Sequence, residues 1–351
     1  MHGFRSIFGD LRTALRRLTG HFRSGQPRQP DTAPAPAADH IDCKLRPEWL
    51  EPDLPFPVPN WRNVAEWIDG HSETLRHDLW TNVARHWATG IAKSFGQGCN
   101  VYETANIFTV QPGPIDRGRR AARHCEDLLK RLRSTLGDMA LQHWYGKFAI
   151  FTAPDQDTYY RYLSLYHRAG EHIQSGGVYI NSGYGHIVLP EPATIQHSRV
   201  LVHEFCHALL HHHRLPLWLD EGITQTAEAA VAGRPINPGH DKTITDHRAF
   251  WRPTNIALLW QGHGFDTPGE TSALCYDLSR LIFGAFLAVD RSLIAQVVTN
   301  ASRDDAGFAG FQDAYGQDPA DLLAELLGPG DWRTGLREEP RREPDTAPPV
   351  D

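Results

Sequence analysis

The chain has 351 residues, with 40% apolar and 22% charged side chains, a net charge of −7 and 20 histidines. This apolar content excludes a wholly disordered chain, and the acidic balance argues against general binding of nucleic acid. Neither a run of about 18 apolar residues nor a secretory-type apolar segment near the N-terminus occurs, so we expect no transmembrane helix and a cytoplasmic location. The five cysteines form no CxxC pair, which argues against a disulfide framework or a cysteine-type zinc site.

The two ends of the chain differ in composition from its middle. Arginine predominates in the arm 1–23, and large apolar residues recur there at helical steps. This arm predicts a basic amphipathic helix that contacts an anionic membrane surface through residues 4–22, docks on the protein itself or on a partner, or stays disordered. Residues 24–44, rich in Pro and Ala, predict a linker, and 336–351 predict a disordered tail. The folded part is therefore expected at 45–335.

The folded part changes character near its middle. The segment 45–192 alternates helical with strand-like patterns, whereas 193–335 is mostly helical. This order predicts an α+β fold, in which a small mixed sheet with an edge hairpin precedes a mostly helical subdomain. The elements expected in chain order are a helix over 70–96, a strand pair over 100–110, a helix over 116–136, a strand over 147–152, a helix over 155–168 and a hairpin over 176–190.

A metal-binding pattern follows the hairpin. Residues 203–207 read His-Glu-Phe-Cys-His, an HExxH motif in a segment of helical character. Positions four apart lie one turn apart on the same helix face, so His203 and His207 can bind one tetrahedral Zn²⁺. Glu204 is placed beside the first of them to take a proton from a water on the metal. Leu215-Pro216 ends this helix and starts another that carries Glu221, a carboxylate suited to be the third ligand.

These two segments together resemble a known family. HEFCHALL followed by LPLWLDEGITQTAE is similar to the gluzincin metallopeptidases, most closely the peptidase MA-like families, and the resemblance covers roughly 145–330. In those families the Glu of WLxEG is the third zinc ligand, which corresponds to Glu221. The resemblance implies a zinc metallopeptidase that acts on peptide or protein substrates. The lack of a motif for a free amine favours an endopeptidase over an aminopeptidase.

A competing zinc geometry is excluded by its neighbours in the sequence. His213 has the spacing of the metzincin motif HExxHxxGxxH, but Leu210 stands at the glycine position and no methionine follows for a Met turn. His211 lies two turns along the helix from His203, roughly 12 Å away, and cannot share one metal with it. Both residues therefore indicate a polar end of the helix.

Two further residues are candidates for supporting roles. Glu228 follows Glu221 by seven residues, on the same helix face, where it either accepts the second N–H of a zinc-bound histidine or is a solvated helix residue. The segment 272–280 is similar to the family's YxxSYxLVRYL helix, with Tyr276 at the matching tyrosine and Ser272 in place of the earlier one. Tyr276 would then stabilise an oxyanion, or be a buried core tyrosine.

An extended substrate is expected to pair with an edge strand, for which 176–179 and 184–189 are the candidates. Two other functions stay open from the sequence. One is a non-catalytic zinc-binding module of peptidase-like architecture, against which the intact Glu204 argues. The other is a membrane-surface protein that acts through its basic arm.

Overall fold

The computed structural model describes residues 44–140, 144–166, 176–191, 195–233 and 243–335. The predicted arm 1–23, the tail 336–351 and nearly all of the linker lie outside these residues. The described chain forms two compact units. The sheet unit takes the residues within Arg16–His212 and Ala227–Ile236, and the helical unit takes those within His213–Thr226 and Asn237–Asp351.

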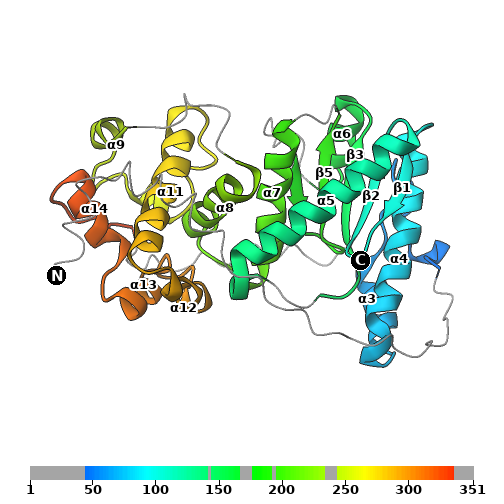
Figure 1. Ribbon diagram of the computed structural model, residues 1–351, viewed down its shortest axis with the longest axis horizontal. Helices are drawn as coiled ribbons and strands as arrows, with labels where there is room; N and C mark the ends of the chain where they lie inside the picture. The colour runs from blue at the N-terminus through cyan, green and yellow to red at the C-terminus, as the bar shows by residue number, and fades with distance from the viewer. Residues whose placement is uncertain (1–43, 141–143, 167–175, 192–194, 234–242, 336–351) are drawn as a thin grey trace. The chain divides into compact units, whose positions relative to one another are not determined.

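The sheet unit is built on five strands in the order β1-β2-β3-β5-β4 (Figure 1). β2, β3 and β5 are parallel to one another, while β1 and β4 pair antiparallel at the two edges. Every residue of β2 and β3 is buried, as expected for parallel strands that are covered on both faces. The predicted small mixed sheet with an edge hairpin is therefore confirmed. The strands are β1 (Asn100–Glu103), β2 (Ile107–Gln111), β3 (Phe148–Ala153), β4 (Val178–Ile180) and β5 (His186–Pro190).

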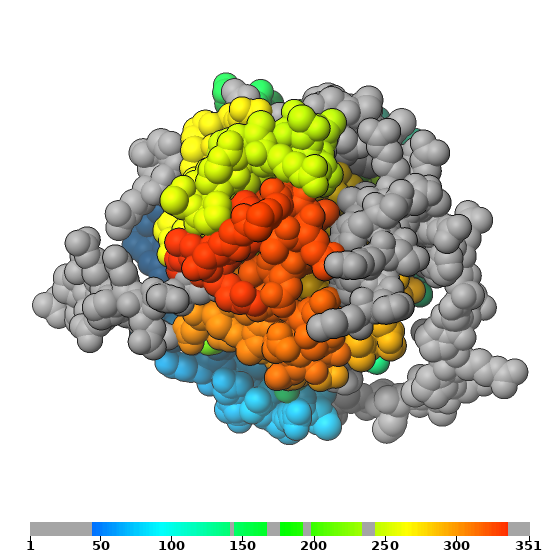
Figure 2. Space-filling model, turned by 90° about the vertical axis from the view of Figure 1, so that its left-hand side faces the viewer, coloured from blue at the N-terminus to red at the C-terminus, as the bar shows by residue number. Residues whose placement is uncertain are grey.

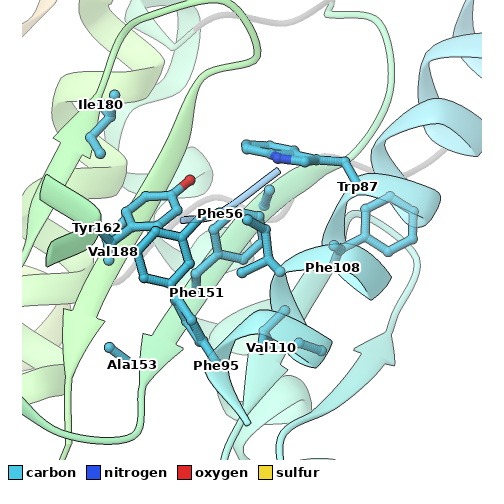
Figure 3. Packing of buried hydrophobic residues seen from close by; sticks show 14 of the residues in the cluster. Phe56, Trp87, Phe95, Phe108, Val110, Phe151, Ala153, Tyr162, Ile180 and Val188 are labelled. Atoms are coloured by element: carbon cyan, nitrogen blue, oxygen red, sulfur yellow. The ribbon is translucent and has the colours of Figure 1, made fainter. Parts of the chain in front are cut away.

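Helices cover both faces of this sheet. The Trp87 ring of α4 packs edge-on against Phe151 of β3, with ring centroids 4.8 Å apart, and Tyr162 of α6 lies on the same face. Figure 3 shows these aromatic side chains converging with Phe108 over the sheet. α5 and α7 cover the opposite face. The helices of this unit are α3 (Trp61–Asp69), α4 (Glu73–Phe95), α5 (Ile115–Leu136), α6 (Gln156–Leu163) and α7 (Ile195–Leu210).

The helix limits follow the expected ones closely, apart from α6. The helix expected over 155–168 ends at Leu163. Its last turns tighten, because the N–H of Leu165 bonds to Tyr162 and that of Tyr166 to Leu163, three residues back instead of four. α4 ends as expected at Gly96, whose φ of 108° favours glycine.

The helical unit has an aromatic core. Trp218 of α8 donates its indole N–H to the carbonyl of Ala306, at 2.9 Å, and its ring lies near Trp260 and Phe311. α9 lies beside α14 (Figure 2), where the Arg248 guanidinium donates to the carbonyl of Leu326. The helices of this unit are the first part of α8 (Leu217–Ala232), α9 (Ile244–Phe250), α10 (Ala257–Trp260), α11 (Glu270–Val289), α12 (Ile294–Asn300), α13 (Phe308–Tyr315) and α14 (Pro319–Leu327). This confirms the mostly helical second half and the α+β class.

One described helix is long and apolar enough to cross a membrane. α11 passes by length and composition, but 67% of the apolar window is buried within the structure. Its buried positions lie on all sides of the helix, as in the central helix of a packed core.

Candidate metal centre

The HExxH motif lies on α7, the helix that packs on the sheet. Phe205 in the middle of the motif places its ring edge-on against Phe148 of β3, with centroids 5.5 Å apart, and Cys206 is fully buried. These contacts fix the rotation of the helix, so that His203 and His207 share its half-exposed face. Their ring centroids are 4.7 Å apart.

α8 supplies the carboxylate. Pro216 starts the helix, since its carbonyl accepts the N–H groups of Leu219 and Asp220. Glu221 follows one turn later and is only 5% exposed. Its neighbour Gly222 lies against α11: a Cβ there would be 2.7 Å from the Ser279 carbonyl oxygen. The glycine of the WLxEG pattern thus permits the close approach of two helices beside the candidate ligand.

One donor atom from each of His203, His207 and Glu221 lies within 4.8 Å of the other two, close enough to hold a metal ion. Two imidazoles and one carboxylate form the ligand set of catalytic zinc sites, with a fourth position left for water. Glu221 is buried, and a positive charge beside it would stabilise its carboxylate in that position. The residues therefore fit a bound metal.

Glu228 reaches back from α8 to the first histidine. Its Oε2 lies 3.3 Å from Nδ1 of His203, and its Oε1 accepts from the Arg199 guanidinium. An ionised carboxylate at Nδ1 makes that nitrogen the protonated one, so Nε2 keeps its lone pair for a metal. Glu228 is 8% exposed, so it is not a solvated helix residue. Its support of a zinc-bound histidine stays a prediction.

The Glu204 carboxylate faces the edge of the sheet. Its Oε2 accepts the backbone N–H of Tyr179 on β4, at 2.7 Å. Gly177, just before β4, lies against α7, because a Cβ there would be 2.7 Å from Val200 Cγ1. β4 therefore lies beside α7, and a backbone N–H of β4 holds the Glu204 carboxylate in its orientation.

Only one of the two predicted edge segments is an edge. Residues 176–179 lead into β4, which among the described residues pairs on one side alone, with β5. Residues 184–189 fall largely in β5, which pairs with β4 on one side and with β3 on the other. The expectation for 184–189 was wrong, because an apolar strand that ends a hairpin and a strand in the sheet interior have the same sequence pattern.

Tyr276 is half-buried on α11. Its ring packs edge-on against Phe265, with centroids 5.0 Å apart, and its backbone carbonyl accepts from the Gln225 side chain at 2.8 Å. Gln225 is one turn after Glu221, so α11 passes this part of α8. A role of its hydroxyl at an oxyanion stays a prediction.

Two other histidines are fully buried and use both ring nitrogens within the protein. His186 bonds a backbone carbonyl through Nδ1 and accepts the Tyr162 hydroxyl at Nε2, at 2.9 Å. His247 donates from Nε2 to Asp277, at 2.9 Å, and accepts the Trp251 indole N–H at Nδ1. Burial lowers the pKa of His186 to about 4. Both are structural histidines, which accounts for part of the high histidine content.

Two contributors to the centre were missed from the sequence. Arg199 lies four residues before His203 on the same helix face, a spacing that could have identified it. The N–H of Tyr179 has no sequence signal, since any residue of an edge strand offers one. Comparison with protein-family models, with curated proteins and with solved structures found no match, so the resemblance to gluzincins depends on the motif residues alone.

Proposed function

We propose that this chain is a zinc metallopeptidase of gluzincin type that hydrolyses peptide bonds within extended polypeptides. The single observation that supports this most is the grouping of the His203, His207 and Glu221 donor atoms beside Glu204. A catalytic zinc site needs three protein ligands and an adjacent general base, and these four residues supply both.

Each residue has one task in this proposal. His203, His207 and Glu221 hold the zinc, which when bound acts as a Lewis acid and lowers the pKa of a water toward about 7. Glu204 accepts the proton of the attacking water and passes it to the leaving amine. Glu228 fixes the ring orientation of His203, and Arg199 holds Glu228 in place.

The substrate would pair with β4, the described edge strand beside α7. The backbone N–H of Tyr179 on this strand donates to Glu204. This bond connects β4, which would hold the peptide, to Glu204, which would transfer the proton. Tyr276 is proposed to donate to the oxyanion.

The test measures both the zinc content and the hydrolytic activity of the Glu204→Gln variant. This variant keeps the shape of the side chain but removes the base, so we expect about one zinc per chain and a loss of cleavage of an unfolded protein by at least about 100-fold. Asp220→Asn on α8 removes a nearby carboxylate that is not in the donor group and should retain both properties. Full activity in zinc-loaded Glu204→Gln would refute the mechanism. Zinc binding without cleavage by the wild type would instead identify a non-catalytic module.

A further inference from the structure

The far edge of the sheet carries an open groove that the proposed peptidase site does not use. It has a volume of about 450 Å³ and lies between β1 and α5, at the opposite edge from β4. Its lining includes Val101, Glu103, Ile115, Arg119 and Arg123. All of these residues belong to the sheet unit.

The directions of the main-chain N–H and C=O groups of β1 follow from its hydrogen bonds, because these directions alternate along an antiparallel strand. Gly113 N–H bonds to the Gly98 carbonyl at 3.0 Å, and Thr104 N–H bonds to the Ile107 carbonyl at 2.9 Å. The even-numbered residues from Gly98 to Thr104 therefore direct their N–H and C=O groups toward β2. Val101 and Glu103 direct theirs outward, where no strand pairs with them among the described residues. The groove thus offers a row of donors and acceptors to an added strand.

The α5 side of the groove is basic and partly apolar. Arg119 and Arg123 are one helix turn apart and exposed, and neither forms an ion pair within the described part of the chain. Ile115, one turn earlier, is 56% exposed. The acidic residue of the groove is neutralised from elsewhere, because Glu103 is bound by Arg85 at 2.9 Å and by Lys147 at 2.6 Å. The charged side chains that line the groove therefore have a positive sum, with two arginines against one glutamate.

We propose that this groove binds an extended acidic peptide, which adds to β1 as a sixth strand and pairs its carboxylates with Arg119 and Arg123. Hydrogen bonds between the main chains contribute affinity that does not depend on the peptide's sequence. The two arginines favour peptides with acidic residues at alternate positions, because alternate side chains of a strand lie on the same face. A second copy of β1 is disfavoured as the occupant, because a two-fold contact would place the same arginines of both copies near each other. The outward N–H and C=O groups favour a peptide over a nucleic acid.

The test uses capped, fluorescein-labelled peptides and the full chain with Glu204→Gln, which prevents cleavage of the probe. A peptide of alternating Glu and Val residues is expected to bind in fluorescence anisotropy at low salt, whereas a Lys–Val peptide and oligo(dT) are not. Arg119→Glu or Arg123→Glu should weaken binding about 5- to 10-fold. Arg120→Glu makes the same charge change on the same helix, outside the groove, and should alter binding less than about twofold.

A peptide-side control separates strand pairing from charge alone. Backbone N-methylation of every Glu, or of every Val, blocks the N–H groups on one side of the added strand only. We expect one of these two peptides to lose binding and the other to retain it. The proposal would be overturned if both methylated peptides bound equally, or if Arg120→Glu weakened binding as much as Arg119→Glu does. It would also be overturned if oligo(dT) bound more tightly than the Glu–Val peptide, or if the Glu–Val peptide did not bind.

Discussion

The close contact between α8 and α11 makes Gly222 a sensitive position. In Gly222→Ala, the added Cβ would meet the Ser279 carbonyl oxygen at 2.7 Å and Phe283 Cβ at 2.9 Å, both shorter than real Cβ contacts allow. Neither neighbour is the end of a flexible side chain, so the helices must separate. Overpacking of this kind costs about 1–3 kcal/mol, and the better helix propensity of alanine offsets up to about 1 kcal/mol. We expect a net loss of about 1–2 kcal/mol in the free energy of unfolding.

The same substitution should also weaken metal binding, because Glu221 is the adjacent residue on α8. Urea unfolding followed by circular dichroism measures the first effect, and competition with a chromophoric zinc chelator measures the second. Gly90→Ala in α4 is a matched control, since its Cβ would meet only the ring of Pro57, at 3.0 Å. If Gly222→Ala unfolds at the wild-type urea concentration and binds zinc unchanged, the reasoning about this contact is refuted.

Two further predictions concern hydrogen-bonded side chains. Glu228→Gln weakens the acceptor at Nδ1 of His203 and should lower metal affinity about 10- to 100-fold in a chelator competition, whereas an unchanged affinity would exclude the positioning role. His186 has a pKa lowered by burial to about 4, while the unfolded chain takes up this proton near pH 6.5, so the native state loses about 3 kcal/mol as the pH falls from about 6.5 to 4. In His186→Gln this part of the pH dependence of urea unfolding should disappear, and an unchanged slope would assign it to other groups.

Local patterns in the sequence were sufficient to locate most elements of the fold. Buried parallel strands such as β3 are short continuous apolar runs, and α5 is strongly amphipathic, so both have a clear signal. The end of α6 is a local change to hydrogen bonds three residues back, which the apolar pattern does not record. The interior place of β5 depends on pairing with β3 and β4, which leaves no period in the sequence either. For the same reason a one-sided strand and a two-sided strand could not be told apart at 184–189.

The donor group was predictable because its geometry is mostly helical. His203 and His207 are one helix turn apart, and Glu228 follows Glu221 by two turns on the same helix face. The contacts between elements were not predictable. The bond from Tyr179 to Glu204 joins a strand to a helix, and the importance of Gly222 follows only from its distance to Ser279. Residues that act through main-chain atoms, or a glycine that acts by having no side chain, give no sequence pattern of their own.

The central claim is that three side chains form one metal site, and zinc content after mutation tests it most directly. Purified wild-type protein, Glu221→Ala and the control Asp220→Asn would be dialysed against the same zinc buffer and measured by mass spectrometry of the metal. We expect about one zinc per chain in the wild type and in Asp220→Asn, and almost none in Glu221→Ala. Stoichiometric zinc in a folded Glu221→Ala protein would contradict it.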